Sequence, residues 1–243
     1  MSRSFLVINR KQVIGAVTAL AVFIALSAFA ANFDRTKAVT AAAQSDKYTL
    51  VIDAGHGGID AGTIGWVTGV REDELNLAVA KYLESFLSKA GATVVMTRSD
   101  DGGLYDADTR SDRQKREDMT RRAQMIRDGG EDYVISIHMN GFTESDACGA
   151  QVLYQTGSAE GMALAQTIQE ELRGGLDATN RRQASAGDYM VLRSASVPAV
   201  LVECGFLSNA AEEEKLMTPA YQERVAWLIY TGLMRYAAER QNV

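Results

Sequence analysis

The chain contains two histidines, and each follows an apolar run typical of a buried strand. His56 lies in the glycine-rich segment "DAGHGG", three residues after the run that ends at Asp53, and His138 closes the run "VISIH". Ligands of open parallel sheets bind at the carboxyl ends of the strands. Both imidazoles are therefore expected at that edge of a sheet, where two converging imidazoles favour a metal site over two unrelated loop residues.

A carboxylate is the third protein ligand expected there, because a catalytic zinc ion commonly takes two histidines and one carboxylate and leaves one position for water. Glu72, Asp73 and Glu74 open the helical stretch that follows the His56 loop, so all three start at the same edge. Spacing favours Glu72 only slightly and leaves the other two as close competitors, since helix N-termini attract acidic residues in any case.

Glu203 ends the apolar run "VPAVLVE", again at this edge of the sheet. A carboxylate buried without a partner is costly, so a glutamate at this position is paired, functional or simply exposed at the end of a strand. As a functional group it would take a proton from a bound water and pass it to a leaving amine.

Three further polar residues flank the two histidines. Asp53 and Asp60 lie on either side of His56, and Asn140 follows His138 by two residues. Ligating imidazoles usually donate their second N–H to a carboxylate or a carbonyl, so we expect these residues to brace the ligands or their loops. For the two aspartates, a turn-forming role is the alternative.

Periodicity predicts the elements that must position these side chains. Strands are expected over 48–53, 92–97, 132–138, 149–154, 189–192 and 198–206, and helices over 72–91, 113–128, 159–172 and from Pro219 onward. Strands that alternate with helices predict an α/β fold, with a mostly parallel sheet flanked by helices on both faces. The dense charge of residues 113–128 is interpreted as a solvated helix face and not as a ligand site.

The N-terminal end predicts export. Basic residues precede an uncharged apolar run over 13–31, which is typical of a signal peptide cleaved after Ala30 or of a retained membrane anchor. Residues 1–31 are therefore interpreted as the export segment, 32–47 as a tether and 48–243 as one extracytoplasmic domain, in the cell wall or anchored to the membrane.

Charge and cysteine content narrow the class further. Residues 1–47 hold six Lys/Arg and two Asp, so the remaining residues carry a net charge of −10. A domain this acidic excludes nucleic-acid binding, which depends on neutralising phosphates. For the two cysteines, Cys148 and Cys204, two free buried thiols are predicted ahead of a disulfide.

Four motifs in the predicted domain carry a family resemblance. The segments "DAGHGGIDAG", a glutamate before "LNL", "SIHMN" and "VECGFLSN" follow one another between Tyr48 and Arg240. Together they resemble the zinc-dependent N-acetylmuramoyl-L-alanine amidases of the Amidase_3 type. The resemblance implies a six-stranded sheet and hydrolysis of the amide between the lactyl group of muramic acid and L-alanine in peptidoglycan. It implies one zinc ion (Zn2+) per chain and four site residues: the ligands His56, Glu72 and His138, and the catalytic Glu203.

Length and tail narrow the resemblance to the germination-specific spore-cortex amidases (CwlD type), which help to convert muramic acid to its δ-lactam. The alternatives are a vegetative amidase of division or autolysis, a zinc peptidase that cuts within the stem peptide, and a non-catalytic wall-binding module. The intact set of four site residues argues against the last. The sequence leaves open whether an activator protein is needed.

Two long polar connections, 99–112 and 173–188, lack the apolar period of a helix that could dock as a lid. We therefore expect an open zinc cleft, with no self-inhibiting helix across it.

Overall fold

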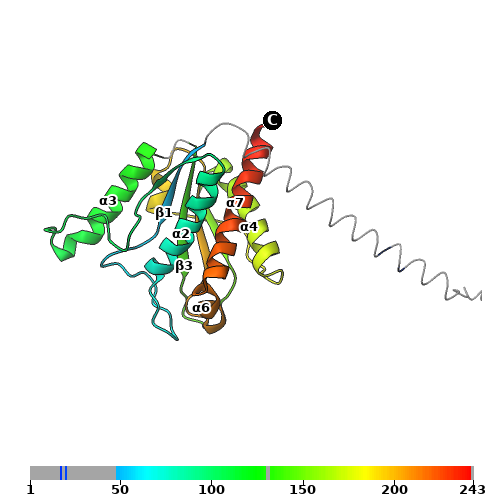
Figure 1. Cartoon of the computed structure of the whole chain (residues 1–243), viewed down its shortest axis with the longest axis horizontal. Coiled ribbons are helices and arrows are strands. Elements are labelled where there is room, and N and C mark those ends of the chain that lie inside the picture. Colours follow the sequence, from blue (N-terminus) through cyan, green and yellow to red (C-terminus); the bar gives the residue numbers. More distant parts are fainter. Residues whose placement is uncertain (1–16, 18–19, 21–47, 130–131, 242–243) are drawn as a thin grey trace, which may run out of the picture.

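A six-stranded sheet forms the centre of the molecule, in the order β2-β1-β3-β6-β4-β5 (Figure 1). The computed structural model describes residues 17, 20, 48–129 and 132–241. The strands are β1 (Thr49–Ala54), β2 (Thr93–Met96), β3 (Tyr133–Asn140), β4 (Gln151–Gln155), β5 (Ser185–Gly187) and β6 (Ala199–Phe206). Four of them, β2, β1, β3 and β6, are parallel, whereas β4 runs antiparallel to β6 and parallel to β5. The predicted mostly parallel, six-stranded sheet is confirmed.

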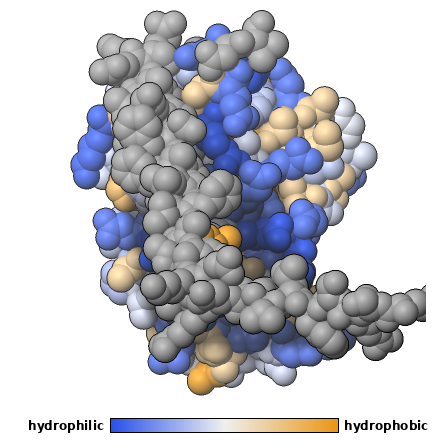
Figure 2. Space-filling model, turned by 90° about the vertical axis from the view of Figure 1, so that its right-hand side faces the viewer, coloured by the Kyte–Doolittle hydropathy of each residue, from blue (hydrophilic) through white to orange (hydrophobic). Residues whose placement is uncertain are grey.

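Helices cover both faces of the sheet, as the apolar strands require. In β1, Leu50 and Ile52 face one side and Val51 the other, and all three are fully buried. The first side packs against α2 (Glu72–Lys89), α4 (Ala159–Leu176) and α7 (Pro219–Gln241), and the second against α3 (Ser111–Gly129) and α5 (Met190–Ser194). A short helix, α6 (Ala210–Leu216), follows β6. Figure 2 views the side on which α4 and α7 lie, where the described residues in view are mostly hydrophilic.

Strand register brings the predicted site residues to one edge of the sheet. Asp53 of β1 lies opposite Ser136 of β3, and His138 of β3 lies opposite Glu203 of β6. Because these strands are parallel, their carboxyl ends open on the same side, and the loop with His56 leaves from β1 there. Helix α2 then returns its first residue, Glu72, to this edge, as expected.

One predicted strand is wrong. Residues 189–192 do not form a strand, because helix α5 begins at Met190. The strand in this part of the chain is the preceding segment, Ser185–Gly187. A run of four apolar residues does not distinguish a strand from one helical turn. Here the adjacent side chains of Val191 and Leu192 are both buried in the core beneath α3, which a helical turn allows. The strand at the edge of the sheet has three residues with small or absent side chains, so its sequence shows almost no apolar pattern.

The predicted export segment and tether, residues 1–47, lie outside the described residues apart from Val17 and Leu20. Of the helices in the described ranges, none has both the length and the hydropathy needed to cross a membrane. Both cysteines are free, as predicted. The predicted burial holds for Cys204 only: Cys148 is exposed because it lies in the loop between β3 and β4.

Candidate active site

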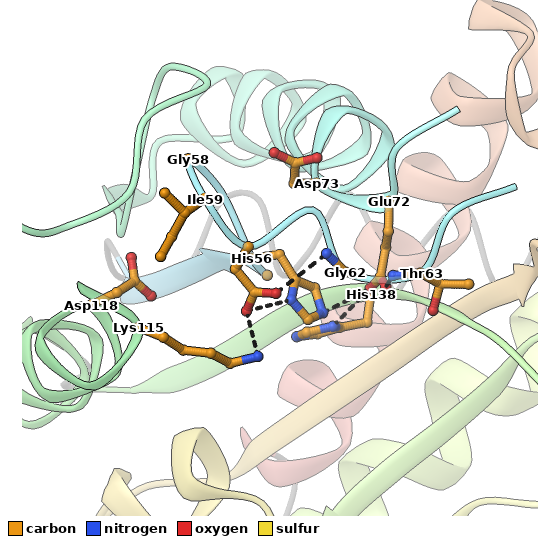
Figure 3. Close-up of polar contacts among 12 residues, drawn as sticks. His56, Gly58, Ile59, Gly62, Thr63, Glu72, Asp73, Lys115, Asp118 and His138 are labelled. Carbon is orange, nitrogen blue, oxygen red and sulfur yellow. Dashed lines mark hydrogen bonds and ion pairs between the residues drawn. The ribbon is translucent and has the colours of Figure 1, made fainter. Parts of the chain in front are cut away.

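Three side chains from separate elements converge at the carboxyl edge of the sheet (Figure 3). His56 comes from the loop after β1, Glu72 from the first turn of α2 and His138 from β3. The Nε2 atom of His56 lies 3.2 Å from Oε1 of Glu72, and Nδ1 of His138 lies 3.0 Å from the same oxygen. One donor atom from each residue lies within 4.8 Å of the others, so the cluster has the size of a metal site.

Backbone and side-chain donors hold Glu72 in this position. Its side chain is almost fully buried, Oε2 accepts the Thr63 N–H at 2.7 Å, and Oε1 accepts the Met139 N–H at 3.1 Å. Asn76, one turn further along α2, donates its amide to Oε1 at 3.2 Å. Burial alone would raise the pKa of Glu72, but hydrogen bonds and charge from the two histidines outweigh it and hold that pKa below its usual range.

The two neighbouring acids have different environments. Asp73 is buried, but both its oxygens accept hydrogen bonds from the Arg71 guanidinium at 2.9 Å. Glu74 has an exposed side chain. Of the three acids that spacing left open, only Glu72 belongs to the cluster.

The His56 loop has a strained conformation that several contacts maintain. His56 has a φ of 62°, the left-handed region that non-glycine residues rarely adopt. Its Nδ1 lies 3.0 Å from Asp60, which favours the tautomer with hydrogen on Nδ1 and a lone pair on Nε2. Lys115 of α3 contacts the same Asp60 oxygen at 2.9 Å (Figure 3). Burial acts to lower the pKa of His56, but Glu72 and Asp60 together raise it to about 9.

Three consecutive carbonyl groups before and at His56 accept hydrogen bonds from buried side chains. Arg98 and Arg122 both donate to Ala54, Arg98 and Asn76 both donate to Gly55, and Arg122 donates to His56. These donors fix the loop backbone, and with it the direction of the His56 imidazole.

Arg122 is an exception to the interpretation of residues 113–128 as a solvated face, which holds for most of their charged side chains. Arg122 is 1% exposed although it lies in the most charged helix of the chain. It pairs with Asp118 on its own helix and with Asp53 of β1, at 2.5 and 2.7 Å. Residue types alone do not show which of many cations turns inward, because that depends on how α3 packs on the sheet.

The three predicted bracing residues have different roles. Asp60 contacts the His56 imidazole directly. Asp53 instead joins Arg122, Thr97 and Ser136, so it links strands and α3. Burial opposes ionisation, but the Arg122 charge and the Ser136 hydroxyl hold the pKa of Asp53 below its usual value. Asn140 lines the cavity, and its backbone carbonyl accepts the Leu207 N–H at 2.9 Å.

Glu203 faces the same cavity with a different balance of contacts. Its Oε2 atom is buried, and none of the described residues donates a hydrogen bond to it. Burial raises the pKa of Glu203 to about 7, and the nearby Glu72 charge acts in the same direction. Its carboxyl group can therefore exchange a proton near neutral pH.

The three clustered residues and Glu203 line a cavity of about 380 Å³. Helix α3 contributes Lys115 and Met119 to one wall, and the start of α5 contributes Tyr189 and Met190 to another. Within the described ranges, the connections 99–112 and 173–188 supply no lining residue.

The cluster fits a zinc ion in donor chemistry and in the support of its ligands. Two imidazole nitrogens and one carboxylate oxygen form a common donor set for catalytic zinc. The Asp60 carboxylate contacts Nδ1 of His56, which leaves Nε2 for a metal, as is usual for ligating histidines. Room for His138 depends on Gly55, since a Cβ atom there would lie 2.3 Å from the imidazole.

Comparison with known proteins agrees with this geometry. Residues 50–235 match the Amidase_3 family, described as N-acetylmuramoyl-L-alanine amidase. The chain belongs to this family. It is therefore an amidase that acts on peptidoglycan, and zinc dependence is a property of its family.

Individual relatives of this amidase are similar over most of its length. The germination-specific N-acetylmuramoyl-L-alanine amidase of Bacillus subtilis is 36% identical over 79% of this chain and 80% of the relative. The amidase LytC of the same organism is 34% identical over 77% of this chain but only 35% of the relative. Among solved structures, the CwlD amidase of Clostridioides difficile, in complex with the GerS lipoprotein, is 36% identical with a TM-score of 0.76, covering 78% of this chain and 98% of that chain.

Sequence reasoning did not identify Arg98, Arg122, Asn76 or Lys115 as supports of the site. Asn76 had a visible signal, because it lies four residues after Glu72 on the same face of a predicted helix. The two arginines and Lys115 had no signal beyond their charge.

Proposed function

We propose that His56, Glu72 and His138 hold one zinc ion in this chain, and that Glu203 is the general base and acid of amide hydrolysis. The bond broken joins the lactyl group of muramic acid to L-alanine. The observation that supports this assignment best is the convergence of three metal-binding atoms beside Glu203, whose buried Oε2 atom accepts no hydrogen bond from the residues that the structure describes.

When bound, the zinc ion would polarise the scissile carbonyl group and lower the pKa of its water. Glu203 would accept a proton from the attacking water and return it to the leaving nitrogen of L-alanine. A carboxyl group with a pKa of about 7 suits both transfers, because it is readily ionised and readily protonated at neutral pH. Asp60 would keep the His56 imidazole in one tautomer, with Nε2 directed at the metal.

For the natural substrate, we propose peptidoglycan of the spore cortex, as part of muramic δ-lactam formation. The similarity to the germination-specific amidase covers most of both chains, whereas the similarity to LytC covers a third of that protein. A vegetative wall substrate is the alternative. Comparing hydrolysis rates on purified cortex and vegetative peptidoglycan separates the two, and faster release from the vegetative wall would contradict the cortex assignment.

Either substrate places the domain outside the cytoplasm, so we propose that residues 1–31 export it, 32–47 tether it and 48–243 form the catalytic domain. If an activating partner is required, as the lipoprotein complex of the C. difficile amidase suggests, we propose that it orders the site or helps to retain zinc. Such a partner would not need to displace a helix from the cavity, because we expect no self-inhibiting helix across it.

Mass spectrometry of muropeptides tests the proposed reaction. The purified protein is incubated with peptidoglycan, with and without a chelator. The proposal predicts stem peptides with a new N-terminal L-alanine, formed only without chelator. Cuts within the stem peptide would instead identify a peptidase, and an unaffected reaction in chelator would contradict the role of zinc.

A further inference from the structure

A β-hairpin beside the catalytic cavity has no part in the chemistry described above. Residues 63–71 leave the His56 loop and return to α2, with Ile64 paired to Arg71. The Gly65 N–H donates to Val70 at 2.8 Å, and the Gly69 N–H donates to Gly65 at 3.1 Å. In Figure 1 this segment, between β1 and α2, extends away from the sheet beside α6.

A buried carboxylate fixes the tip of this hairpin. Glu213 of α6 is fully buried and accepts the N–H groups of Val67 and Thr68 at 2.9 and 2.8 Å. The Thr68 hydroxyl donates to it as well, at 2.6 Å. Gly65 permits this close approach, because a Cβ atom there would lie 2.4 Å from the Glu213 carboxylate. The tip is therefore held in one conformation.

This rigid tip displays large apolar side chains to solvent. Trp66 is 56% exposed and Val67 is 67% exposed. Phe142, 55% exposed, lies nearby: the Trp66 N–H donates to Leu207 and the Phe142 N–H to Ser208, two adjacent residues of one turn. Large apolar side chains held rigidly in water are typical of a binding surface.

The exposed side chains continue the wall of the catalytic cavity. Thr63 and Gly141 both line the cavity and lie against each other, since a Cβ atom on Gly141 would approach Thr63 to 2.7 Å. Ile64 and Phe142 are the next residues along each chain segment. A substrate leaving the cavity on this side would therefore meet the hairpin.

The two sides of the cavity differ in charge. Residues 61–70 contain no charged side chain, whereas charged groups line the other side. These are Lys115, which pairs with Asp60, and Asp118 and Arg122, which pair with each other. The substrate has a matching asymmetry, because an N-acetylated sugar chain lies on one side of the scissile amide and a stem peptide with carboxylates on the other. An exposed tryptophan favours a sugar as the ligand, because aromatic rings stack on the apolar faces of sugar rings.

The size of the patch also argues against a protein partner, because a few side chains bury much less area than a stable protein interface.

We propose that the hairpin of residues 63–71, together with Phe142, binds the glycan strand, with a sugar ring stacked on Trp66, while the stem peptide extends toward Lys115. This assignment rests on the proposed amidase function and specifies how the substrate is oriented.

The chain offers a matched pair of tryptophans for the test. Trp227 of α7 is 44% exposed and packs against Phe86 and Tyr230. In a Trp227→Phe protein, Trp66 is the remaining tryptophan. Its fluorescence should change saturably when soluble, peptide-free glycan oligomers of N-acetylglucosamine and N-acetylmuramic acid are added. A Trp66→Phe protein, which retains Trp227, should show no such change.

Kinetics supply the second measurement. Trp66→Ala should raise the KM for polymeric peptidoglycan by roughly tenfold, because the apolar surface buried between one sugar ring and the indole is lost, with kcat unchanged. Hydrolysis of a small muramoyl-peptide should be unaffected, and Trp227→Ala should behave as the wild type on both substrates.

The outcomes separate this proposal from the proposed reaction, because the titration does not depend on hydrolysis. Two results with an active enzyme would contradict the glycan site. One is Trp66 fluorescence that does not change when glycan is added, and the other is a Trp66→Ala variant with the wild-type KM on the polymer. The same holds if Trp66→Ala instead abolishes binding of a protein partner at unchanged KM. A wild-type protein that binds glycan but does not cleave the amide contradicts only the reaction.

Discussion

Glu72 and Glu203 lie at the same edge of the sheet, one at the start of α2 and the other near the end of β6. Glu72 accepts two backbone N–H groups and the Asn76 amide, and both histidines contact it. In contrast, the Oε2 atom of Glu203 accepts no hydrogen bond from any residue in the described ranges. The pKa of Glu72 is lowered, whereas the pKa of Glu203 is raised to about 7.

The comparison shows that burial does not determine the role of a carboxyl group by itself. Burial acts to raise the pKa of both glutamates. At Glu72, hydrogen bonds and charge from His138 and His56 reverse the direction, whereas at Glu203 burial prevails. A carboxylate that is fixed and ionised suits metal binding, and one that can gain and lose a proton suits acid–base chemistry.

The largest expected effect comes from removing an imidazole. His56→Ala or His138→Ala should abolish zinc binding and amidase activity together, because two remaining protein ligands seldom hold a catalytic zinc ion. Elemental analysis of the purified variants measures the metal. Full zinc occupancy in either variant would remove that histidine from the ligand set.

Changing the other glutamate should separate metal binding from catalysis. Glu203→Gln keeps the size of the side chain but cannot accept the proton, so turnover should fall by roughly 10²–10⁴-fold at unchanged zinc content. Muropeptide release by the zinc-loaded variant provides the measurement. Near-normal release would assign the proton transfer to another group.

A smaller effect is expected when one donor to Glu72 is lost. Asn76→Ala removes the amide that fixes Oε1 and should lower zinc affinity by about 10–100-fold, measured by competition with a chelator. Asn180→Ala is the control, because Asn180 is also buried but donates its amide to the Ala150 carbonyl and not to Glu72. Equal losses in the two variants would show a general effect on the fold.

The smallest effect concerns pH in the metal-free protein. The pKa of His56 is raised from 6.5 to about 9, so its contribution to stability is complete below pH 6.5 and is lost as the pH rises through 9. The shift corresponds to about 3 kcal/mol at most. Urea unfolding of the metal-free wild type and of His56→Asn should show a difference that shrinks between pH 6.5 and 9. A constant difference would contradict the ion pairing of His56.

Much of this site could be predicted because the topology of a parallel sheet constrains it. His56, His138 and Glu203 each follow an apolar run, and parallel strands bring the ends of such runs together. Spacing alone left Glu72, Asp73 and Glu74 open, and the family resemblance selected Glu72. The structure adds the physical reason, because the Asp73 carboxylate is paired with Arg71.

The supports of the site were beyond sequence reasoning for the same reason. Arg122 lies in a helix rich in similar charges, and only the docking of α3 on β1 buries it. The edge strand at 185–187 is short and weakly apolar, so the apolar pattern predicts a strand at the neighbouring residues instead. The sequence gives no sign that Trp66 is exposed. Its position at the tip of a fixed hairpin depends on the hydrogen bonds from the tip to Glu213, which is 147 residues away along the chain.

A zinc-loaded crystal structure with anomalous diffraction at the zinc edge tests the difference between the two glutamates most directly. We expect one zinc ion per chain, bound by His56 Nε2, His138 Nδ1 and a Glu72 oxygen, with the Glu203 carboxylate outside the coordination sphere. A zinc ion coordinated by Glu203, or one bound without Glu72, would contradict it.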